Sequence, residues 1–122
     1  MTIDRNIDHL HPSMAARVRN LQTRIDREGL PFRVFETYRT PDRQAQLHAE
    51  GTATQAGSFH SAHQFGLAAD FAVINAHGVW EWPSMEDPIW DRLHALAYEV
   101  SLTAPISWDP GHISWPSRRT LI

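Results

Sequence analysis

Apolar residues along this chain recur at helical spacing in some stretches and alternate with polar residues in others. Over residues 12–29 they recur every three or four positions with arginines between them, which predicts an amphipathic helix. The apolar side chains of this stripe are Met14, Val18, Leu21 and Ile25. We expect Ser13 to cap the helix at its beginning and Gly29 to end it.

The next segments predict a strand, a helix and a loop. Residues 32–39 (FRVFETYR) are aromatic and β-branched with rough alternation, which predicts a strand. Thr40, followed by a proline, is typical of a helix N-cap, and we expect this helix over residues 41–50 with Gly51 at its end. Residues 52–60 are small and polar, which predicts a loop.

The second half of the chain predicts further strands and one more helix. Residues 66–74 (GLAADFAVI) are typical of a buried strand, and residues 75–82 of a turn followed by a short strand. A third helix is expected to begin at Asp87 and Pro88, and a final short strand at residues 112–115. The apolar face of the third helix consists of Trp90, Leu93, Leu96, Ala97 and Val100. These elements predict an α+β fold, with about three helices packed on a small antiparallel sheet.

The amino-acid composition limits the possible chemistry of the protein more than it limits the possible folds. A length of 122 residues, with 42% hydrophobic and 20% charged residues, predicts one globular domain over residues 1–122. The net charge of −3 does not favour a nucleic-acid partner. The absence of cysteine excludes disulfides and thiolate metal ligands, so a metal site must use His, Asp or Glu, and the chain has eight histidines.

His63 and Asp70, within SAHQFGLAAD (residues 61–70), are the first candidates for such a site. Their spacing puts them on opposite faces of a straight strand and is not the three- or four-residue spacing of neighbours on a helix face. They can converge only through a turn, which Gly66 can make because glycine adopts backbone angles closed to other residues. A hydrogen-bonded pair at the end of a strand is the alternative interpretation.

WDPGHISW, residues 108–115, offers a third ligand. His112 begins the last predicted strand, which can pair beside the strand of Asp70. Asp109 lies on the Pro-Gly turn before it, where a carboxylate can act as a general base without binding the metal. Two histidines and one carboxylate, with an open fourth position, are typical of a catalytic zinc site.

These motifs resemble those of the zinc D-alanyl-D-alanine carboxypeptidase and L-alanyl-D-glutamate endopeptidase family, which shares a fold with the hedgehog signalling domain. The family pattern is Ser-x-His, two residues, Gly-x-Ala-x-Asp, and a distal acid two residues short of a histidine. The residues that fit this pattern are Ser61, His63, Gly66, Ala68, Asp70, Asp109 and His112. YRTPDRQAQLHAEG (residues 38–51) resembles the family's Tyr-Arg turn and following helix, and Thr54 stands where the family often has a threonine. The resemblance covers residues 30–115.

The resemblance implies a role for each of these side chains. His63, Asp70 and His112 are expected to bind one zinc ion per chain with water at the fourth position, and Asp109 to pass that water's proton to the leaving amine. Arg39 is expected to hold a substrate carboxylate or the developing oxyanion. Contacts with the substrate are further expected from Ser61, Gln44, Tyr38 and Trp108, with Phe65 and Trp115 as additional walls of the groove.

Plainer interpretations stay open for several of these residues. Arg39 can equally form a surface salt bridge, Ser61 can be a turn or cap residue, and Gln44 can be structural. His60 lies close to the motif, but the family has no metal ligand at that place.

By this resemblance we expect a monomeric zinc metallopeptidase that hydrolyses peptidoglycan stem peptides. An L-alanyl-D-glutamate endopeptidase acting as a phage or prophage endolysin is the preferred form, and a D-alanyl-D-alanine carboxypeptidase is the alternative. A non-catalytic zinc-bearing domain that binds the cell wall or a partner, for example in a phage tail, is the alternative from another class. The N-terminal segment does not resemble a signal peptide, and no apolar run is long enough to span a membrane. We therefore expect synthesis in the cytoplasm, action at the cell wall, and neither nucleic acid nor membrane as a partner.

Overall fold

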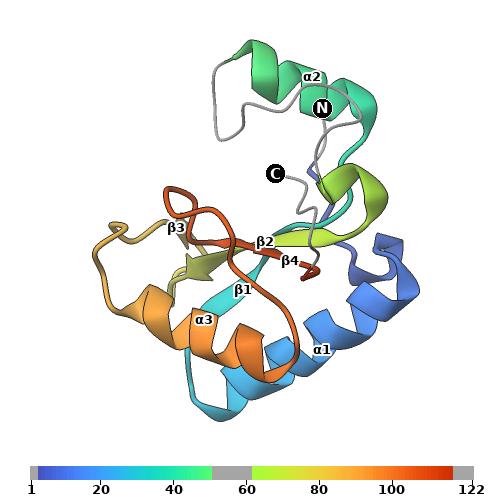
Figure 1. Ribbon diagram of the computed structural model, residues 1–122. Coiled ribbons are helices and arrows are strands. Elements are labelled where there is room, and N and C mark those ends of the chain that lie inside the picture. The colour runs from blue at the N-terminus through green and yellow to red at the C-terminus, as the bar shows by residue number, and fades with distance from the viewer. Residues whose placement is uncertain (1–2, 51–61, 117–122) are drawn as a thin grey trace.

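The computed structural model describes residues 3–50 and 62–116. These residues form three α-helices, two short 3₁₀ helices and one four-stranded antiparallel sheet, which confirms the predicted α+β fold (Figure 1). In chain order the elements are η1 (Ile7–His9), α1 (Pro12–Arg27), β1 (Phe32–Glu36), α2 (Pro41–Ala49), η2 (Ala62–Phe65), β2 (Ala68–Ile74), β3 (Trp80–Glu81), α3 (Ile89–Glu99) and β4 (His112–Ser114). Among the described helices, none has the length and apolar character needed to cross a membrane.

Strand β2 is the centre of the sheet and determines which residues meet at the site. It pairs with β1 along one edge, and with β3 and β4 at different ends of the other. The register places Asp70 beside Glu36 of β1 and beside His112 of β4. This pairing confirms that the strand of His112 lies next to the strand of Asp70, and it joins two segments that are far apart in the sequence.

Helices α1 and α3 lie together on one side of the sheet, whereas α2 stands apart on the other side (Figure 1). The predicted stripe of α1 is buried against α3 and the sheet, and the ring of Phe32 lies 5.2 Å from the ring of Trp90. Burying a large apolar side chain contributes about 1.5–3 kcal/mol to folding. The largest fully buried apolar side chains are Phe32, Phe71, Met14, Leu21, Ile25, Leu93, Leu102 and Ile113.

The helix ends agree with the predictions except at the beginning of α1. Its N-cap is His11, whose Nδ1 accepts a hydrogen bond of 3.2 Å from the backbone N–H of Ser13, so the assignment of Ser13 as N-cap was wrong. Pro12 occupies the first helical position and thereby places Ser13 inside the first turn. Gly29 follows the end of α1 in the left-handed conformation, with φ of 69°, as expected of a helix stop.

The second helix begins as its sequence predicts. Thr40 is the N-cap of α2, and its hydroxyl accepts a hydrogen bond from the backbone N–H of Arg43. The helix ends at Ala49 with Glu50 as C-cap. Gly51 and the loop expected at residues 52–60 lie outside the described residues.

Strands β1 and β2 are shorter than expected, and both differences matter for the site. The register of β1 against β2 shifts between Val34 and Glu36, and β1 ends at Glu36 instead of residue 39. After the strand, the backbone N–H of Thr37 donates to the carbonyl of Asp4, and the backbone N–H of Arg39 donates to the carbonyl of His63. β2 begins at Ala68 rather than at residue 66, because the preceding residues form the 3₁₀ turn η2.

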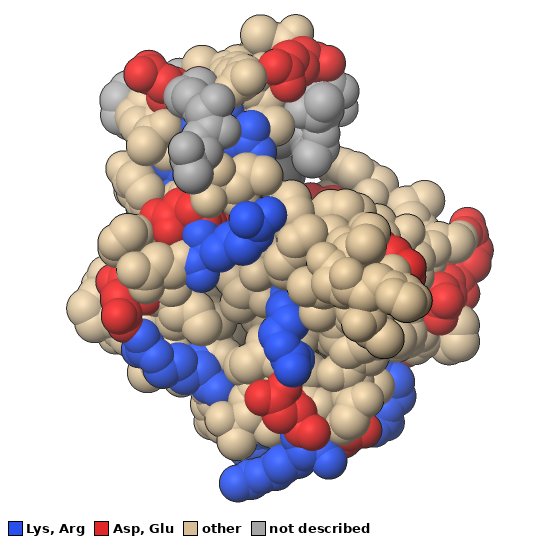
Figure 2. All heavy atoms as spheres, turned by 180° about the vertical axis from the view of Figure 1, so that it is seen from behind, with Lys and Arg blue, Asp and Glu red and all other residues tan. Residues whose placement is uncertain are grey.

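Charged side chains of both signs are found on the face opposite to that of Figure 1. On the face that Figure 2 shows, acidic and basic residues are interspersed among uncharged ones. This distribution agrees with the small net charge of −3.

Candidate metal centre

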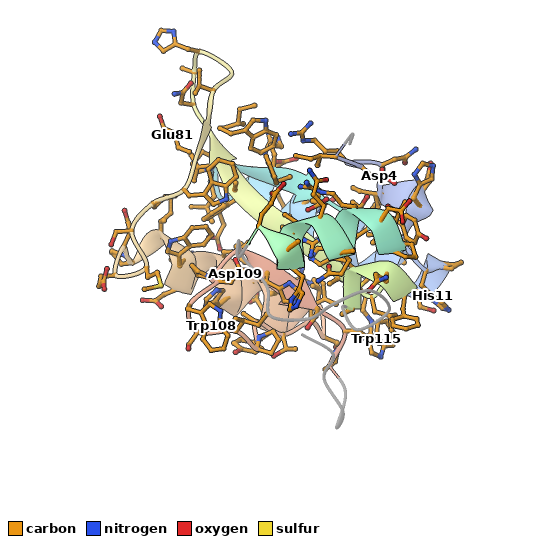
Figure 3. The ribbon with its side chains drawn as sticks, turned by 90° about the horizontal axis from the view of Figure 1, so that it is seen from above. Asp4, His11, Glu81, Trp108, Asp109 and Trp115 are labelled. Carbon is orange, nitrogen blue, oxygen red and sulfur yellow. The ribbon has the colours of Figure 1, made fainter. Side chains whose placement is uncertain are left out.

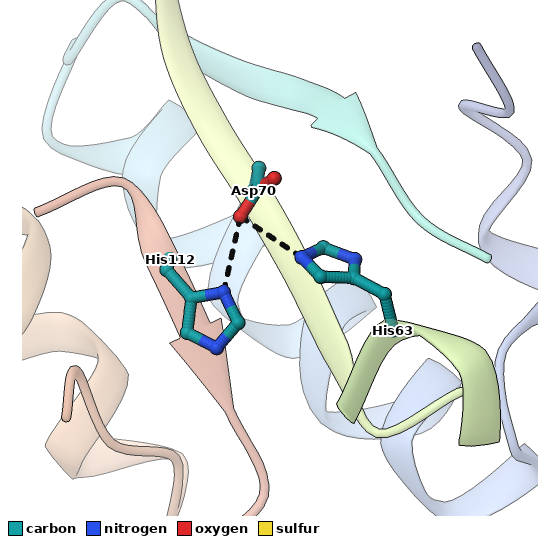
Figure 4. A group of neighbouring side chains, drawn as sticks. All are labelled: His63, Asp70 and His112. Atoms are coloured by element: carbon teal, nitrogen blue, oxygen red, sulfur yellow. Dashed lines mark hydrogen bonds and ion pairs between the residues drawn. The ribbon is translucent and has the colours of Figure 1, made fainter. Parts of the chain in front are cut away.

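His63, Asp70 and His112 come together between η2, β2 and β4 (Figure 4). One potential ligand atom from each residue lies within 4.8 Å of the other two. Asp70 Oδ1 lies 3.1 Å from His63 Nε2 and 3.3 Å from His112 Nδ1. A single carboxylate oxygen therefore faces a ring nitrogen of each histidine.

Gly66 makes the turn that brings His63 back towards Asp70, as its place in the sequence predicts. Its φ of 69° lies in the left-handed region, which glycine adopts without strain. A Cβ at this position would lie 2.5 Å from the backbone nitrogen of His11. The carbonyl of Gly66 accepts a hydrogen bond from the same nitrogen, at 3.1 Å. The turn is thus joined to the beginning of α1, and a side chain at residue 66 would break that junction.

The His63 ring is held in one orientation by its other nitrogen. Nδ1 lies 2.8 Å from the carbonyl oxygen of Thr37, and because a carbonyl only accepts, Nδ1 carries the hydrogen. In the neutral ring, Nε2 then presents a lone pair to Asp70 Oδ1, itself an acceptor. Burial lowers the pKa of His63 and favours this neutral ring, although the charge of Asp70 opposes the shift. A proton or a metal ion can join these two atoms, and a metal ion can be bound by the neutral ring and the carboxylate together.

His112 completes the group from strand β4. Its ring lies 5.1 Å from the ring of His63 in an edge-to-face arrangement. Its Nε2 is buried and has no hydrogen-bond partner among the described residues. Burial opposes ionisation of Asp70, but the neighbouring His63 and His112 hold the pKa of that carboxyl well below its usual range. A charged carboxylate between two imidazoles fits a divalent transition metal such as zinc.

Arg39 holds the second oxygen of Asp70. Its Nη2 donates to Asp70 Oδ2 and to Glu36 Oε1, both at 3.0 Å, and its Nη1 donates to Gln44 Oε1 at 2.9 Å. The residue is only 4% exposed, so the surface salt bridge considered for Arg39 is wrong. Gln44 is also buried. Both side chains therefore lie behind Asp70 as a layer of hydrogen bonds that orients it.

Glu36 belongs to the same network, and the sequence analysis did not identify it. It is 2% exposed, and its Oε2 accepts a hydrogen bond of 3.1 Å from Arg43 Nε. A signal was present, because Glu36 is a charged residue within the predicted strand, on the same alternation as the buried Phe32. A buried carboxylate in phase with core residues requires charged partners, which here are Arg39 and Arg43.

Asp109 lies on the turn before β4, as its Pro-Gly context predicts. Its carbonyl accepts the backbone N–H of His112, and the next carbonyl, of Pro110, accepts a hydrogen bond of 2.7 Å from His94 Nε2 on α3. Burial raises the pKa of the Asp109 carboxyl to about 6, and the nearby charge of Asp70 acts in the same direction. A half-buried carboxyl with a pKa near neutrality is suited to proton transfer.

A cavity of about 230 Å³ joins these groups. Asp70, Asp109, Arg39 and Arg43 all line it, and its aromatic walls are Phe35 and Trp82. The ring of Trp82 packs edge-to-face against that of Phe35 with centroids 4.8 Å apart, and Trp82 is 57% exposed. The sequence analysis named neither aromatic residue.

The remaining predicted contact residues lie around this cavity or outside the described part of the chain. Trp108 is exposed beside Asp109 (Figure 3), and Tyr38 is half-buried; neither is among the residues that line the cavity. Phe65 and Trp115 line a different groove, together with His11, Ser13 and Leu67. Ser61, Thr54 and His60 lie outside the described residues.

Comparison with known proteins finds similarity at the level of three-dimensional structure. No family model and no curated protein matches the sequence. Several solved structures match over most of the chain, among them the following three. One is LdcB, an LD-carboxypeptidase whose structure reveals the molecular basis of peptidoglycan recognition. It has a TM-score of 0.69 and 16% identity over 90% of this chain. The Serratia marcescens L-Ala D-Glu endopeptidase ChiX has a TM-score of 0.65 and 22% identity over 91% of this chain.

The third structure is the vancomycin resistance D,D-pentapeptidase VanY in complex with Zn(II), with a TM-score of 0.64 and 19% identity over 87% of this chain. The chain spans 60% of the length of LdcB, 84% of ChiX and 72% of VanY. These similarities establish that the chain has the fold of these peptidases, the same group that its motifs resemble.

Proposed function

We propose that this protein is a zinc-dependent peptidase that hydrolyses stem peptides of peptidoglycan. The observation that carries the proposal is the convergence of His63, Asp70 and His112, with Asp70 and Asp109 lining the same cavity. Three ligands and a separate carboxylate are the parts that hydrolysis of a peptide bond requires. The shared fold supports the proposal, since the three matched structures are named as peptidases and one of them contains Zn(II).

The preferred specificity is for the L-alanyl-D-glutamate bond. ChiX bears this activity in its name, and this chain covers 84% of its length. We propose a single catalytic domain over residues 1–122 that works as a monomer with one zinc ion, in the manner of a phage or prophage endolysin. A D-alanyl-D-alanine carboxypeptidase is the second candidate, favoured by the similarity to a D,D-pentapeptidase.

Each side chain has a task in this reaction. His63, Asp70 and His112 would hold the zinc ion, which when bound would supply a Lewis acid for the scissile carbonyl and the attacking water. Asp109 accepts a proton from that water on its carboxylate and donates it to the nitrogen of the leaving amine. Arg39 and Gln44 keep Asp70 oriented, and the Thr37 carbonyl keeps His63 Nε2 unprotonated. Ser61, Tyr38 and Trp108 remain proposed contacts with the substrate.

Digestion of purified peptidoglycan with the zinc-loaded protein, followed by mass spectrometry, tests this proposal. New N-terminal D-glutamate is expected for the endopeptidase, whereas released D-alanine would assign the carboxypeptidase instead. His63→Ala is the inactive control, and it is expected to lose zinc as measured by metal analysis. Intact peptidoglycan after incubation with the fully zinc-loaded protein would contradict the enzyme and favour the non-catalytic binding domain.

A further inference from the structure

Two guanidinium groups line the cavity beside the metal centre, and they differ in whether their η nitrogens are engaged. Arg39 donates both its η nitrogens to protein groups and is 4% exposed. Arg43 uses Nε for Glu36 Oε2, at 3.1 Å, and its side chain is 16% exposed. Within residues 3–50 and 62–116, no partner is found for the two η nitrogens of Arg43. Arg43 thus has its terminal donors to spare, whereas the one unpartnered nitrogen of Arg39, Nε, is buried.

The fold holds Arg43 firmly enough to recognise a ligand. The residue lies in the first turn of α2, and its backbone N–H is bound by the Thr40 hydroxyl. Its Nε hydrogen bond goes to a carboxylate that is 2% exposed and is also bound by Arg39. A guanidinium fixed through Nε keeps its terminal donors available, and such donors match the two oxygens of a carboxylate.

The charges of the cavity also favour an anion once the metal is bound. Three carboxylates contribute, from Glu36, Asp70 and Asp109, against the two guanidiniums of Arg39 and Arg43. A bound dication makes the positive charges outnumber the negative ones. If the Nη2 of Arg39 bound a substrate carboxylate, it would lose its hydrogen bond to Asp70 or to Glu36. The η nitrogens of Arg43 can bind a carboxylate without the loss of a hydrogen bond.

We propose that Arg43 binds the free carboxylate of the residue whose amine leaves during hydrolysis. This inference rests on the proposed function, and it fits both candidate bonds. In D-alanyl-D-alanine the leaving residue ends in a carboxylate, and in an L-alanyl-D-glutamyl peptide the glutamate keeps one carboxyl group that is not in a peptide bond. Arg43 is therefore a determinant of substrate specificity, distinct from the ligands and from Asp109.

The test compares two substrates on the zinc-loaded protein, one with this carboxylate free and one with it converted to a carboxamide. The unmodified protein is expected to prefer the carboxylate by about 10- to 100-fold in kcat/KM, the range of one charged hydrogen-bonded pair. Arg43→Gln is expected to lose this preference while its kcat/KM on the carboxamide stays within a few-fold. Arg33→Gln is the matched control, because Arg33, on β1, forms an exposed ion pair with Asp26 of α1.

Several outcomes would overturn the proposal. An unchanged preference in Arg43→Gln, with zinc content and melting temperature preserved, would remove Arg43 from substrate recognition. An equal loss on both substrates would assign Arg43 a structural role through Glu36. If Arg43→Gln does not fold, Arg43→Lys keeps the positive charge without the paired donors. It is expected to retain a smaller preference, and an undiminished preference would contradict the proposed pairing.

If the proposed function is wrong, the result differs from all of these outcomes. In that case the zinc-loaded protein cleaves neither substrate. Calorimetric titration with the dipeptide in its acid and amide forms then tests Arg43 without catalysis. Tighter binding of the acid form that disappears in Arg43→Gln supports the assignment, and equal binding of both forms refutes it.

Discussion

The two carboxylate oxygens of Asp70 have different partners, and this difference determines the role of each neighbouring residue. Oδ1 faces the two histidines, while Oδ2 accepts a hydrogen bond from Arg39. A carboxylate fixed in this way presents one oxygen to a metal. Arg39 therefore acts through Asp70 as a positioning residue, in addition to any contact with substrate.

Replacement of Arg39 by glutamine tests this positioning role. Zinc affinity is expected to fall about 10- to 100-fold, the usual cost of losing a partner of a metal ligand. The free energy of unfolding is expected to fall by about 3–5 kcal/mol, because Glu36 keeps a buried charge with one partner fewer. Zinc titration and urea unfolding measure the two effects. A fall in kcat/KM with normal zinc affinity would instead favour a direct role on the substrate.

Asp109→Ala separates proton transfer from metal binding. We expect zinc content and melting temperature to be preserved, because Asp109 is not among the three ligands, and kcat to fall by about 10²- to 10⁴-fold. Metal analysis and turnover of peptidoglycan fragments measure both. Near-normal turnover would remove Asp109 from the mechanism.

Asp109 also determines how the activity is expected to depend on pH. A general base must be ionised, so activity is lost as pH falls through its pKa. Burial raises that pKa to about 6, and a bound dication lowers it again because positive charge favours the carboxylate. The acid limb of kcat/KM is therefore expected at or below pH 6. The limb should be missing from the residual activity of Asp109→Ala, and a limb that persists there would belong to another group.

Among the secondary-structure elements, η2 carries the first ligand, His63, and the turn at Gly66 joins η2 to β2. Gly66 and Gly78 both have positive φ, of 69° and 76°. They differ in their surroundings, because a Cβ at Gly66 meets the backbone of His11, and a Cβ at Gly78 meets no atom within 4 Å. The two glycines form a matched pair that separates backbone strain from steric conflict.

Gly66→Ala is expected to weaken zinc binding and to destabilise the protein more than Gly78→Ala does. Gly78→Ala carries only the cost of the left-handed conformation, about 1–2 kcal/mol, and leaves the site intact. Gly66→Ala adds displacement of α1 or of η2, and η2 holds His63. Urea unfolding and zinc titration of both variants check this. Equal effects of the two substitutions would show that the junction with His11 is unimportant.

At the scale of the whole molecule, the proposed metal joins segments that are far apart in the sequence. η2, β2 and β4 each supply one ligand, so a bound ion links both halves of the chain. Removal of zinc with a chelator is expected to lower the melting temperature. With zinc at 100 to 1,000 times its Kd, the stabilisation is about 2.7–4.1 kcal/mol. Scanning calorimetry with and without chelator measures it, and His63→Ala should show no chelator effect.

Much of the fold could be predicted from the sequence because the signals are local. The stripe of α1 repeats within four residues, Thr40 caps α2 through Arg43, and Gly66 stands where a turn is required. The wrong assignment of the N-cap to Ser13 has the same local origin, because His11 and Ser13 stand on either side of Pro12 and only one of them can be the N-cap. The shift in β1 at Glu36 was not predictable, because it depends on pairing with β2.

The sequence by itself determined which chemistry is available: histidine and carboxylate donors without cysteine, a glycine that allows the chain to turn, and an aspartate on a Pro-Gly turn before His112. Only the tertiary structure decided how these groups share one site. Pairing of β4 with β2 set His112 beside Asp70, and burial of Glu36 engaged Arg39 while leaving donors on Arg43. The reason is physical, since residue type and spacing are local properties, whereas burial and charge pairing depend on segments that meet only in the folded chain.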